Sequence, residues 1–251
     1  MTFGEFVNDG LFRYLVEKYE IRGTAVMFVL LGCLFGCVAA GYLLGSLNSA
    51  VIFSRAVFGK DIRESGSKNA GMTNMFRVFG KKGGLLTLAG DVLKTALAVA
   101  AGVFFYGRGG AYLAGFFCML GHMFPCYYRF RGGKGMLVCS AVLLFCDPPV
   151  FFICLLVFAG VLLVSRMVSL GSVMAALTMP LFLFEWYKIF GEDGALLGIR
   201  MPIALLMGIS VIAAHIPNIK RIYAGTEPRI TFPWEKKKGE KKDKKEKNRK
   251  D

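Results

Sequence analysis

Histidine, acidic side chains and paired cysteines are scarce in this sequence. It has 2 histidines and 17 acidic residues among 251 positions, and none of its 7 cysteines forms a Cys-x-x-Cys pair. A histidine-rich or paired-cysteine metal site is therefore excluded. Most of the cysteines lie within apolar runs, so we expect small buried side chains there rather than disulfides.

Charged residues are also few, at 19%, and most of them fall in a few loops and in the last sixteen positions. The rest of the chain is long apolar runs, and the mean hydropathy is +0.53. A soluble domain would need several buried helices without a polar face, which a chain this short can hardly cover. The pattern is typical of helices in lipid and predicts an all-α, polytopic membrane protein.

Seven apolar segments are candidate transmembrane helices, and together they predict one membrane domain over residues 25–234. A full span needs about 20 residues, so the short fourth and fifth segments are expected to tilt or to be partly buried. The seven expected spans are 25–46, 84–106, 111–128, 136–145, 150–164, 168–187 and 201–216.

Lysine and arginine are distributed unevenly among the connections between these spans. They concentrate in 47–83, 129–135, 165–167 and the C-terminal tail, which all lie on one side if the spans alternate. The positive-inside rule then predicts an outside N-terminus and a cytoplasmic C-terminus. Every polar, glycine-rich segment falls on that same cytoplasmic face.

The two ends of the chain differ from the membrane domain. Residues 1–24 mix charged and apolar side chains, which indicates an amphipathic helix against the bilayer or the bundle rather than a signal peptide. Residues 235–251 are mostly lysine, typical of a disordered solvated tail or of a segment attracted to anionic lipid headgroups. The net charge of +14 invites a nucleic-acid interpretation, but the distribution of the charge, with this lysine-rich run at the end, argues against it.

A polar segment over 64–77 is rich in glycine, hydroxyl and amide side chains. Glycine lets backbone N–H groups turn toward an anion, and a guanidinium can bind a phosphate through two hydrogen bonds. An ordinary polar loop is the alternative interpretation. The candidate residues are Gly66, Ser67, Asn69, Gly71, Thr73, Asn74 and Arg77.

A second candidate is the turn Gly132-Gly133-Lys134-Gly135, just before the fourth expected span. Free N–H groups at a helix N-terminus, the positive end of the helix dipole and an ammonium together attract an anion. It is not a Walker A loop, because the upstream glycine spacing and the hydroxyl residue after the lysine are missing. A simple helix-entry turn is the alternative, although three glycines exceed what it needs.

Both histidines lie near the cytoplasmic ends of expected spans. His215 and Asn218 end the last span, with Pro217 expected to break the helix between them. Beside two anion-binding segments, His215 is a candidate proton carrier or hydroxyl-orienting group, with a plain interfacial histidine as the alternative. His122 is interpreted as either a helix-packing residue or a part of the site.

Asp91 and Lys94 lie one turn apart inside the second expected span. Ionisable groups at that depth are costly and are usually paired. An intrahelical structural pair is the default interpretation, and support of the site is the second.

Three of these segments, in this order, resemble the PlsY-type acyl-phosphate:glycerol-3-phosphate acyltransferases of bacteria. That family shows Gly-Ser-x-Asn-x-Gly-x-Thr-Asn, then Gly-His-x-x-Pro with Phe-(Lys/Arg)-Gly-Gly-Lys-Gly, and a closing His-x-x-Asn-Ile-x-Arg with Gly-x-Glu. The resemblance covers about 45–229, and Lys68 and Met72 depart from it. The matching positions are Gly66, Ser67, Asn69, Gly71, Thr73, Asn74, Gly121, His122, Pro125, Phe130, Gly132, Gly133, Lys134, Gly135, His215, Asn218, Ile219, Arg221, Gly225 and Glu227.

The resemblance implies an acyl phosphate donor, glycerol 3-phosphate as acceptor, and lysophosphatidate and phosphate as products, in the first step of phospholipid biosynthesis. It implies a catalytic set of Ser67, Arg77, Lys134, His215 and Asn218, and no metal or dissociable cofactor. We expect a monomer in the bacterial plasma (inner) membrane, in contact with membrane lipids, with a cytoplasmic active face on which a soluble acyl-phosphate-producing enzyme docks transiently. The expected substrate-binding residues are Gly66, Asn69, Gly71, Thr73, Asn74, Gly132, Gly133, Gly135 and His122.

Two rival functions use the same features. A transporter for an anionic substrate would also use glycine-rich donors, but it favours internal repeats, and the two halves of this chain show none. A membrane scaffold could recruit an acidic partner through the lysine tail, which leaves the clustered polar residues unexplained. The His-x-x-x-x-Asp motif of the other large glycerolipid acyltransferase class is absent.

Overall fold

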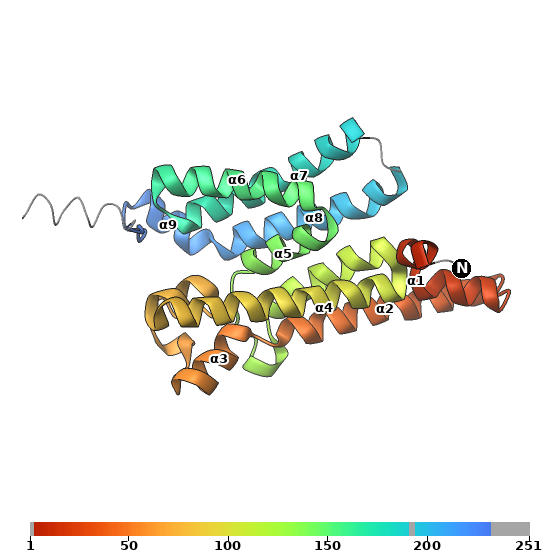
Figure 1. Ribbon diagram of the computed structural model, residues 1–251, viewed down its shortest axis with the longest axis horizontal. Coiled ribbons are helices and arrows are strands. Elements are labelled where there is room, and N and C mark those ends of the chain that lie inside the picture. The colour runs from red at the N-terminus through yellow and green to blue at the C-terminus, as the bar shows by residue number, and fades with distance from the viewer. Residues whose placement is uncertain (1–2, 191–193, 232–251) are drawn as a thin grey trace, which may run out of the picture.

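The computed structural model describes residues 3–190 and 194–231, and every regular element in that part of the chain is helical. The all-α prediction is therefore confirmed for the described residues. Figure 1 shows long helices running roughly alongside one another. They are α1 (Phe3–Lys18), α2 (Thr24–Ser46), α3 (Ser49–Phe58), η1 (Ile62–Glu64), α4 (Met72–Met123), η2 (Cys126–Tyr128), α5 (Met136–Cys146), α6 (Pro148–Ser165), α7 (Val168–Phe190), α8 (Gly194–Ala214) and α9 (Ile216–Tyr223).

Helix α4 is folded back on itself, although its 52 residues form one continuous element. The break is at Tyr106 and Gly107, where Gly107 has φ 56°, a conformation that glycine adopts without strain. Lys94 and His122 lie 28 residues apart in sequence yet touch at 2.9 Å, whereas a straight helix would separate them by about 42 Å. The expected spans 84–106 and 111–128 are thus the two arms of this hairpin.

The region between α2 and the first arm of α4 differs from the prediction. We expected one connection over 47–83, but α3 and the first turns of α4 occupy much of it. Asn48 caps α3 by accepting a hydrogen bond from the Val51 N–H, and Gly80 interrupts α4 with φ 65°. As a result, Thr73 and Arg77 lie on a short helix rather than in a loop.

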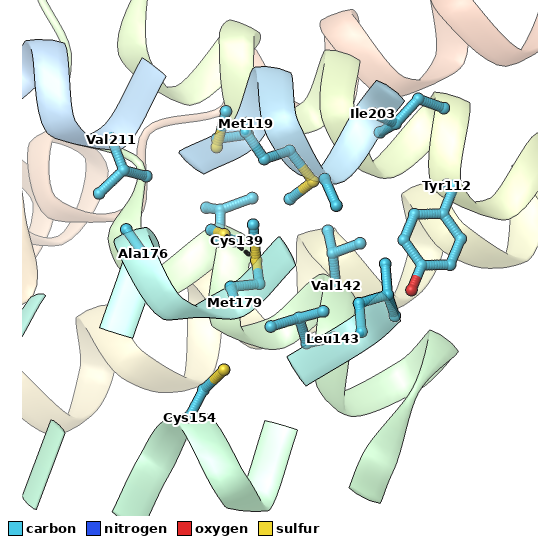
Figure 2. Packing of buried hydrophobic residues seen from close by; sticks show 14 of the residues in the cluster. Tyr112, Met119, Cys139, Val142, Leu143, Cys154, Ala176, Met179, Ile203 and Val211 are labelled. Carbon is cyan, nitrogen blue, oxygen red and sulfur yellow. Dashed lines mark hydrogen bonds between the residues drawn. The ribbon is translucent and has the colours of Figure 1, made fainter. Parts of the chain in front are cut away.

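The core lies where α4, α5, α7 and α8 meet. Figure 2 shows its side chains, among them Tyr112 and Met119 of α4, Val142 of α5, Met179 of α7 and Val211 of α8. These five side chains are at most 1% exposed, so they supply much of the hydrophobic stabilisation. The packing holds α5 against α4 and α6, and thereby sets the position of the turn that precedes α5.

The outer faces of the helices are apolar, as lipid contact requires. Phe35 on α2 is 73% exposed, and Val164 on α6 is 88% exposed. Within residues 3–190 and 194–231, four helical segments are long and apolar enough to cross a membrane, or up to five with α8 and α9 as one bent span and with folded α4 counted once. Each of the seven expected spans nevertheless overlaps a helix or one arm of α4, although 111–128 extends past the end of α4 at Met123 and 201–216 past the end of α8 at Ala214.

The two ends of the molecule carry different elements. Helix α1 packs against the α4 break, where a Cβ on Gly107 would lie 2.0 Å from the Asn8 carbonyl oxygen. Figure 1 shows α1 at one end, and α3, α9 and the start of α4 at the other. The lysine tail expected over 235–251 lies outside the described residues.

Candidate active site

A cavity of about 1270 Å³ opens among α4, α5, α6, α7 and α9. One part is lined by the two polar segments, by His215 and Asn218, and by the chain that follows α9. The other part is lined by apolar side chains of α5, α6 and α7, including Leu143, Phe158 and Met179. The cavity therefore joins a polar, positively charged region to an apolar region.

All the predicted site residues except Gly132 line this cavity. Gly132 lies behind it, where a Cβ would come within 2.0 Å of the His122 carbonyl oxygen. Segments that lie more than 50 residues apart in sequence thus meet at one place. Sequence spacing alone does not show this juxtaposition.

The first polar segment is organised by one buried amide. Asn74 is 1% exposed; its Oδ1 accepts the Ser67 N–H at 2.9 Å, and its Nδ2 donates to the carbonyls of Ser65 at 3.0 Å and Asn69 at 3.1 Å. Asn74, which we expect to bind substrate, lines the cavity, and these bonds also give its amide a role in holding the loop. The side chains of Ser67 and Arg77 remain exposed beside the cavity.

The second polar turn closes onto the end of α4. Gly135 is the N-cap of α5 with φ 79°, a left-handed conformation that suits glycine. The Gly133 N–H donates to the His122 carbonyl at 3.1 Å. These contacts aim Lys134 into the cavity, at the entrance of a helix whose N-terminus favours anions.

Lys134 links the second turn to the third segment. Its Nζ donates a hydrogen bond to Asn218 Oδ1. Burial lowers the pKa of Lys134 to about 8, and the charges of Arg221 and Arg77 add to this effect while Glu227 opposes it. An anion bound beside Lys134 would offset that repulsion, so the arrangement favours anion binding.

The third segment bends where α8 meets α9. The two helices form an angle of 53°, and the bend lies at His215, which is the N-cap of α9. We expected Pro217 to break the helix between His215 and Asn218. Instead it occupies the first turn of α9, where its missing N–H costs nothing.

Glu227 is a site residue that the sequence did not assign to the candidate site. Its Oε1 accepts hydrogen bonds from Asn218 Nδ2 at 2.7 Å and from Ser169 Oγ at 2.6 Å, and its Oε2 accepts from Arg221 Nε at 2.7 Å. Burial opposes its ionisation, but these hydrogen bonds outweigh it and hold the pKa of Glu227 below its usual value. The Gly-x-Glu motif that the sequence shares with the PlsY-type family could have identified Glu227 as a site residue. No sequence feature pointed to Ser169.

The hydrogen bond that His215 makes through Nδ1 determines the protonation of its other ring nitrogen, Nε2. Its Nδ1 lies 2.8 Å from the Val211 carbonyl oxygen, and a carbonyl only accepts, so Nδ1 carries the hydrogen. In the neutral ring Nε2 is then an acceptor. This acceptor lies on a residue that lines the cavity, where it can receive a hydrogen bond from a substrate hydroxyl.

The Asp91–Lys94 pair is confirmed, with Nζ 2.9 Å from Asp91 Oδ1. It is not solely intrahelical, because Lys94 Nζ also lies 2.9 Å from His122 Nδ1 on the second arm of α4. No group of three or more His, Cys, Asp or Glu side chains among the described residues is placed to hold a metal ion.

The fold and the cavity define a class of protein: a helical integral membrane protein whose polar, cationic pocket continues into an apolar groove. The family profile described as glycerol-3-phosphate acyltransferase matches residues 35–225. The chain belongs to this family and is an acyltransferase. Residues 1–34, including α1, lie outside the match.

Relatives of known name support the same assignment. A glycerol-3-phosphate acyltransferase of Geobacillus kaustophilus is 39% identical over 192 residues, which cover 76% of this chain and 93% of the relative. The protein of the same name from Bacillus subtilis is 38% identical, over 78% of this chain and 96% of its own length.

A solved structure has the same fold. The crystal structure of PlsY (YgiH), an integral membrane glycerol 3-phosphate acyltransferase in its glycerol 3-phosphate form, superimposes with a TM-score of 0.71 at 33% identity. The match covers 80% of this chain and 96% of that one. The lysophosphatidic acid form of the same protein gives a TM-score of 0.69.

Proposed function

We propose that the protein transfers an acyl group from an acyl phosphate to the 1-hydroxyl of glycerol 3-phosphate, giving lysophosphatidate and phosphate. One observation carries this proposal: Ser67, Arg77, Lys134, His215 and Asn218 line a single cavity that continues into an apolar groove. The polar part suits two phosphate groups. The apolar part suits a fatty acyl chain.

The reaction is a direct displacement at the acyl carbonyl carbon. The glycerol hydroxyl oxygen forms the new ester bond, the bond from the carbonyl carbon to the phosphate oxygen breaks, and phosphate leaves with the electron pair. The hydroxyl proton passes to the phosphate group, directly or through His215 Nε2. Because phosphate is a good leaving group, no covalent enzyme intermediate is required.

Each proposed catalytic side chain has a role that its contacts support. Lys134 and Arg77 neutralise phosphate charge, and Ser67 adds a hydroxyl donor. Asn218 holds the Lys134 ammonium through its Oδ1. His215 orients the glycerol hydroxyl through Nε2. Preorganised donors of this kind contribute about 3–4 kcal/mol each to stabilising a transition state.

Glycines and small polar residues complete the binding surface in this proposal. Their backbones and polar side chains shape the pocket for the two phosphates. Gly132 and Gly133 hold the second turn against the end of α4, His122 borders that turn, and Asn74 keeps the first loop in place. The proposed substrate-binding residues are Gly66, Asn69, Gly71, Thr73, Asn74, Gly132, Gly133, Gly135 and His122.

The membrane arrangement is part of the proposal. Seven spans, with α4 counted as two, give an N-terminus outside and a C-terminus in the cytoplasm of a bacterial inner membrane, with the active face cytoplasmic. Residues 1–24 form an amphipathic segment, 25–234 the catalytic domain and 235–251 a cytoplasmic lysine-rich tail. The protein acts as a monomer and receives its donor from a soluble enzyme that docks transiently.

A donor panel tests the reaction. Purified protein in detergent is incubated with labelled glycerol 3-phosphate and with acyl phosphate, acyl-CoA or acyl carrier protein. We expect labelled lysophosphatidate from acyl phosphate alone. Product from either other donor at a comparable rate would overturn the donor assignment, and absence of any product would favour the transporter, because detergent leaves no compartments.

Deletion of 235–251 separates the enzyme from the scaffold interpretation. We expect the truncated protein to keep full catalysis and to lose only association with anionic surfaces, because the tail lies beyond every cavity-lining residue in sequence. Loss of catalysis in folded, truncated protein would contradict this division of roles.

A further inference from the structure

Three buried ionisable side chains lie directly behind the second polar turn. Asp91, Lys94 and His122 are 1%, 5% and 3% exposed. Lys94 Nζ lies 2.9 Å from Asp91 Oδ1 and 2.9 Å from His122 Nδ1. The cluster joins the two arms of α4, and the proposed displacement gives no role to Asp91 or Lys94.

The contacts determine which nitrogen of His122 carries the hydrogen. His122 Nδ1 lies 2.9 Å from Lys94 Nζ and 3.6 Å from Asp91 Oδ1. The shorter contact is to the ammonium, which only donates hydrogen bonds, so Nδ1 accepts and the hydrogen of the neutral ring is on Nε2. Asp91 balances the charge of Lys94 and keeps the ammonium in place. His122 Nε2 lies beside Gly133, where a Cβ would come within 2.1 Å of it, and His122 lines the cavity.

Lys94 also connects the two polar segments. Its Nζ donates to the carbonyls of Gly45 at 3.2 Å and Leu47 at 3.1 Å, at the end of α2. The next residue, Asn48, donates from Nδ2 to the Ala70 carbonyl of the first segment at 3.4 Å. One buried ammonium thus holds the end of α2 and His122, each of which contacts a different polar segment.

We propose that His122 binds the substrate phosphate held at the 132–135 turn, with Nε2–H as the donor, and that Lys94 and Asp91 are positioning residues that fix this tautomer. This inference rests on the proposed function. It deepens that function by naming a side chain from the interior of the bundle that donates a hydrogen bond to the bound phosphate. Removal of Lys94 frees His122 to place its hydrogen on Nδ1, which turns Nε2 into an acceptor that faces an anion.

Two substitutions of His122 separate the roles of its ring nitrogens. His122→Asn keeps an acceptor near Nδ1 and removes the Nε2 donor, whereas His122→Gln reaches the Nε2 position with an amide N–H. We expect His122→Asn to raise the KM of one phosphate-bearing substrate by about 10- to 100-fold, the range for one hydrogen bond to a charged group. His122→Gln should raise the same KM less, with kcat changing far less than KM in both.

The positioning pair is tested by removing both charges together, because Lys94→Met alone leaves a buried carboxylate unpaired. Asp91→Asn/Lys94→Met should raise the KM of the same substrate as His122→Asn does. Adding His122→Asn to this double variant should then have little further effect. Titration of the detergent-purified proteins with glycerol 3-phosphate or inorganic phosphate, without an acyl donor, measures the affinity independently of the transfer reaction.

Thr87→Val is the matched control, since it removes a buried α4 hydrogen bond to the Gly83 carbonyl outside the cavity. It should lower the melting temperature without a change in KM. Equal KM values for the Gln and Asn variants, or a folded double variant with wild-type KM, would overturn the inference. Absence of product from wild-type protein with acyl phosphate would instead overturn the proposed donor and leave the binding result standing.

Discussion

The two histidines lie on different walls of one cavity and are held in opposite states. His122, on α4, contacts a lysine ammonium through Nδ1, so its Nε2 is a donor. His215, between α8 and α9, contacts a backbone carbonyl through Nδ1, so its Nε2 is an acceptor. The same residue type is thereby suited to an anion on one wall and to a hydroxyl on the other. The difference is determined by the group that contacts Nδ1, which is an ammonium at His122 and a backbone carbonyl at His215.

The largest effect is expected from His215→Asn, which is compared with the same substitution at His122. Asparagine can keep the Nδ1 contact and always removes Nε2, so His215→Asn deletes the acceptor that orients the hydroxyl. We expect kcat to fall by about 10²- to 10⁴-fold, the range for a general acid–base group. Steady-state kinetics in detergent measures it, with His122→Asn as the matched control that acts on KM. Equal effects of both variants on kcat would remove the distinction between the walls.

A second test addresses Lys134, which lies between the walls. Lys134→Ala removes the ammonium that contacts Asn218, and kcat/KM for acyl phosphate should fall by about 10²- to 10³-fold, as for one preorganised donor. Phosphate release from acyl phosphate measures this, with the exposed Lys188→Ala as control. Near wild-type activity of the variant would leave the anion-binding role of the turn without support. If added salt lowers the activity of the wild-type protein to the same extent, the loss would indicate surface electrostatics instead.

The pH dependence sharpens the account of Lys134. Burial, with the charges of Arg221 and Arg77, lowers its pKa to about 8, so the free enzyme loses the ammonium as pH rises through 8. Values of kcat/KM should therefore decline above about pH 8, approaching a tenfold loss per further pH unit. Arg221→Gln should move this decline to higher pH, because it removes a positive neighbour. An unchanged or downward shift would contradict that electrostatic account.

The same lowered pKa has an opposite consequence for stability. The unfolded chain binds this proton up to pH 10.5 and the folded chain only up to about 8, so between these values the unfolded state holds more protons. The contribution of Lys134 to the free energy of unfolding therefore rises between pH 8 and 10.5. Activity and this part of stability should change in opposite directions over that interval.

The smallest effect is expected at the apolar end, away from both histidines. Phe158 on α6 lines the groove, and Phe158→Ala should shift the preference toward longer or bulkier acyl chains by about tenfold, as for a small change in an apolar pocket. A series of acyl phosphates of increasing length measures it. Leu163→Ala, at a lipid-exposed α6 position that does not line the cavity, is the control and should leave the preference unchanged.

Much of the fold followed from the pattern of apolar runs. Each expected span overlaps a helix or one arm of α4, because the length of an apolar run limits where a lipid-exposed helix can lie. The helix over 49–58 and the early start of α4 at Met72 were not predicted. These elements are short and amphipathic or polar, so their helicity depends on Asn48 capping and on packing of Ile62 and Met75.

The sequence by itself determined the class of chemistry. Clustered glycines, hydroxyls, amides and cations on one expected face specify anion binding, since those groups are the donors that phosphate requires. Which of them reach the cavity was decided by tertiary structure. Gly132 lies behind the cavity, Asn74 lines it with an amide bonded to its own loop, and Glu227 holds Asn218. Those outcomes depend on contacts between residues far apart in sequence, which local spacing does not encode.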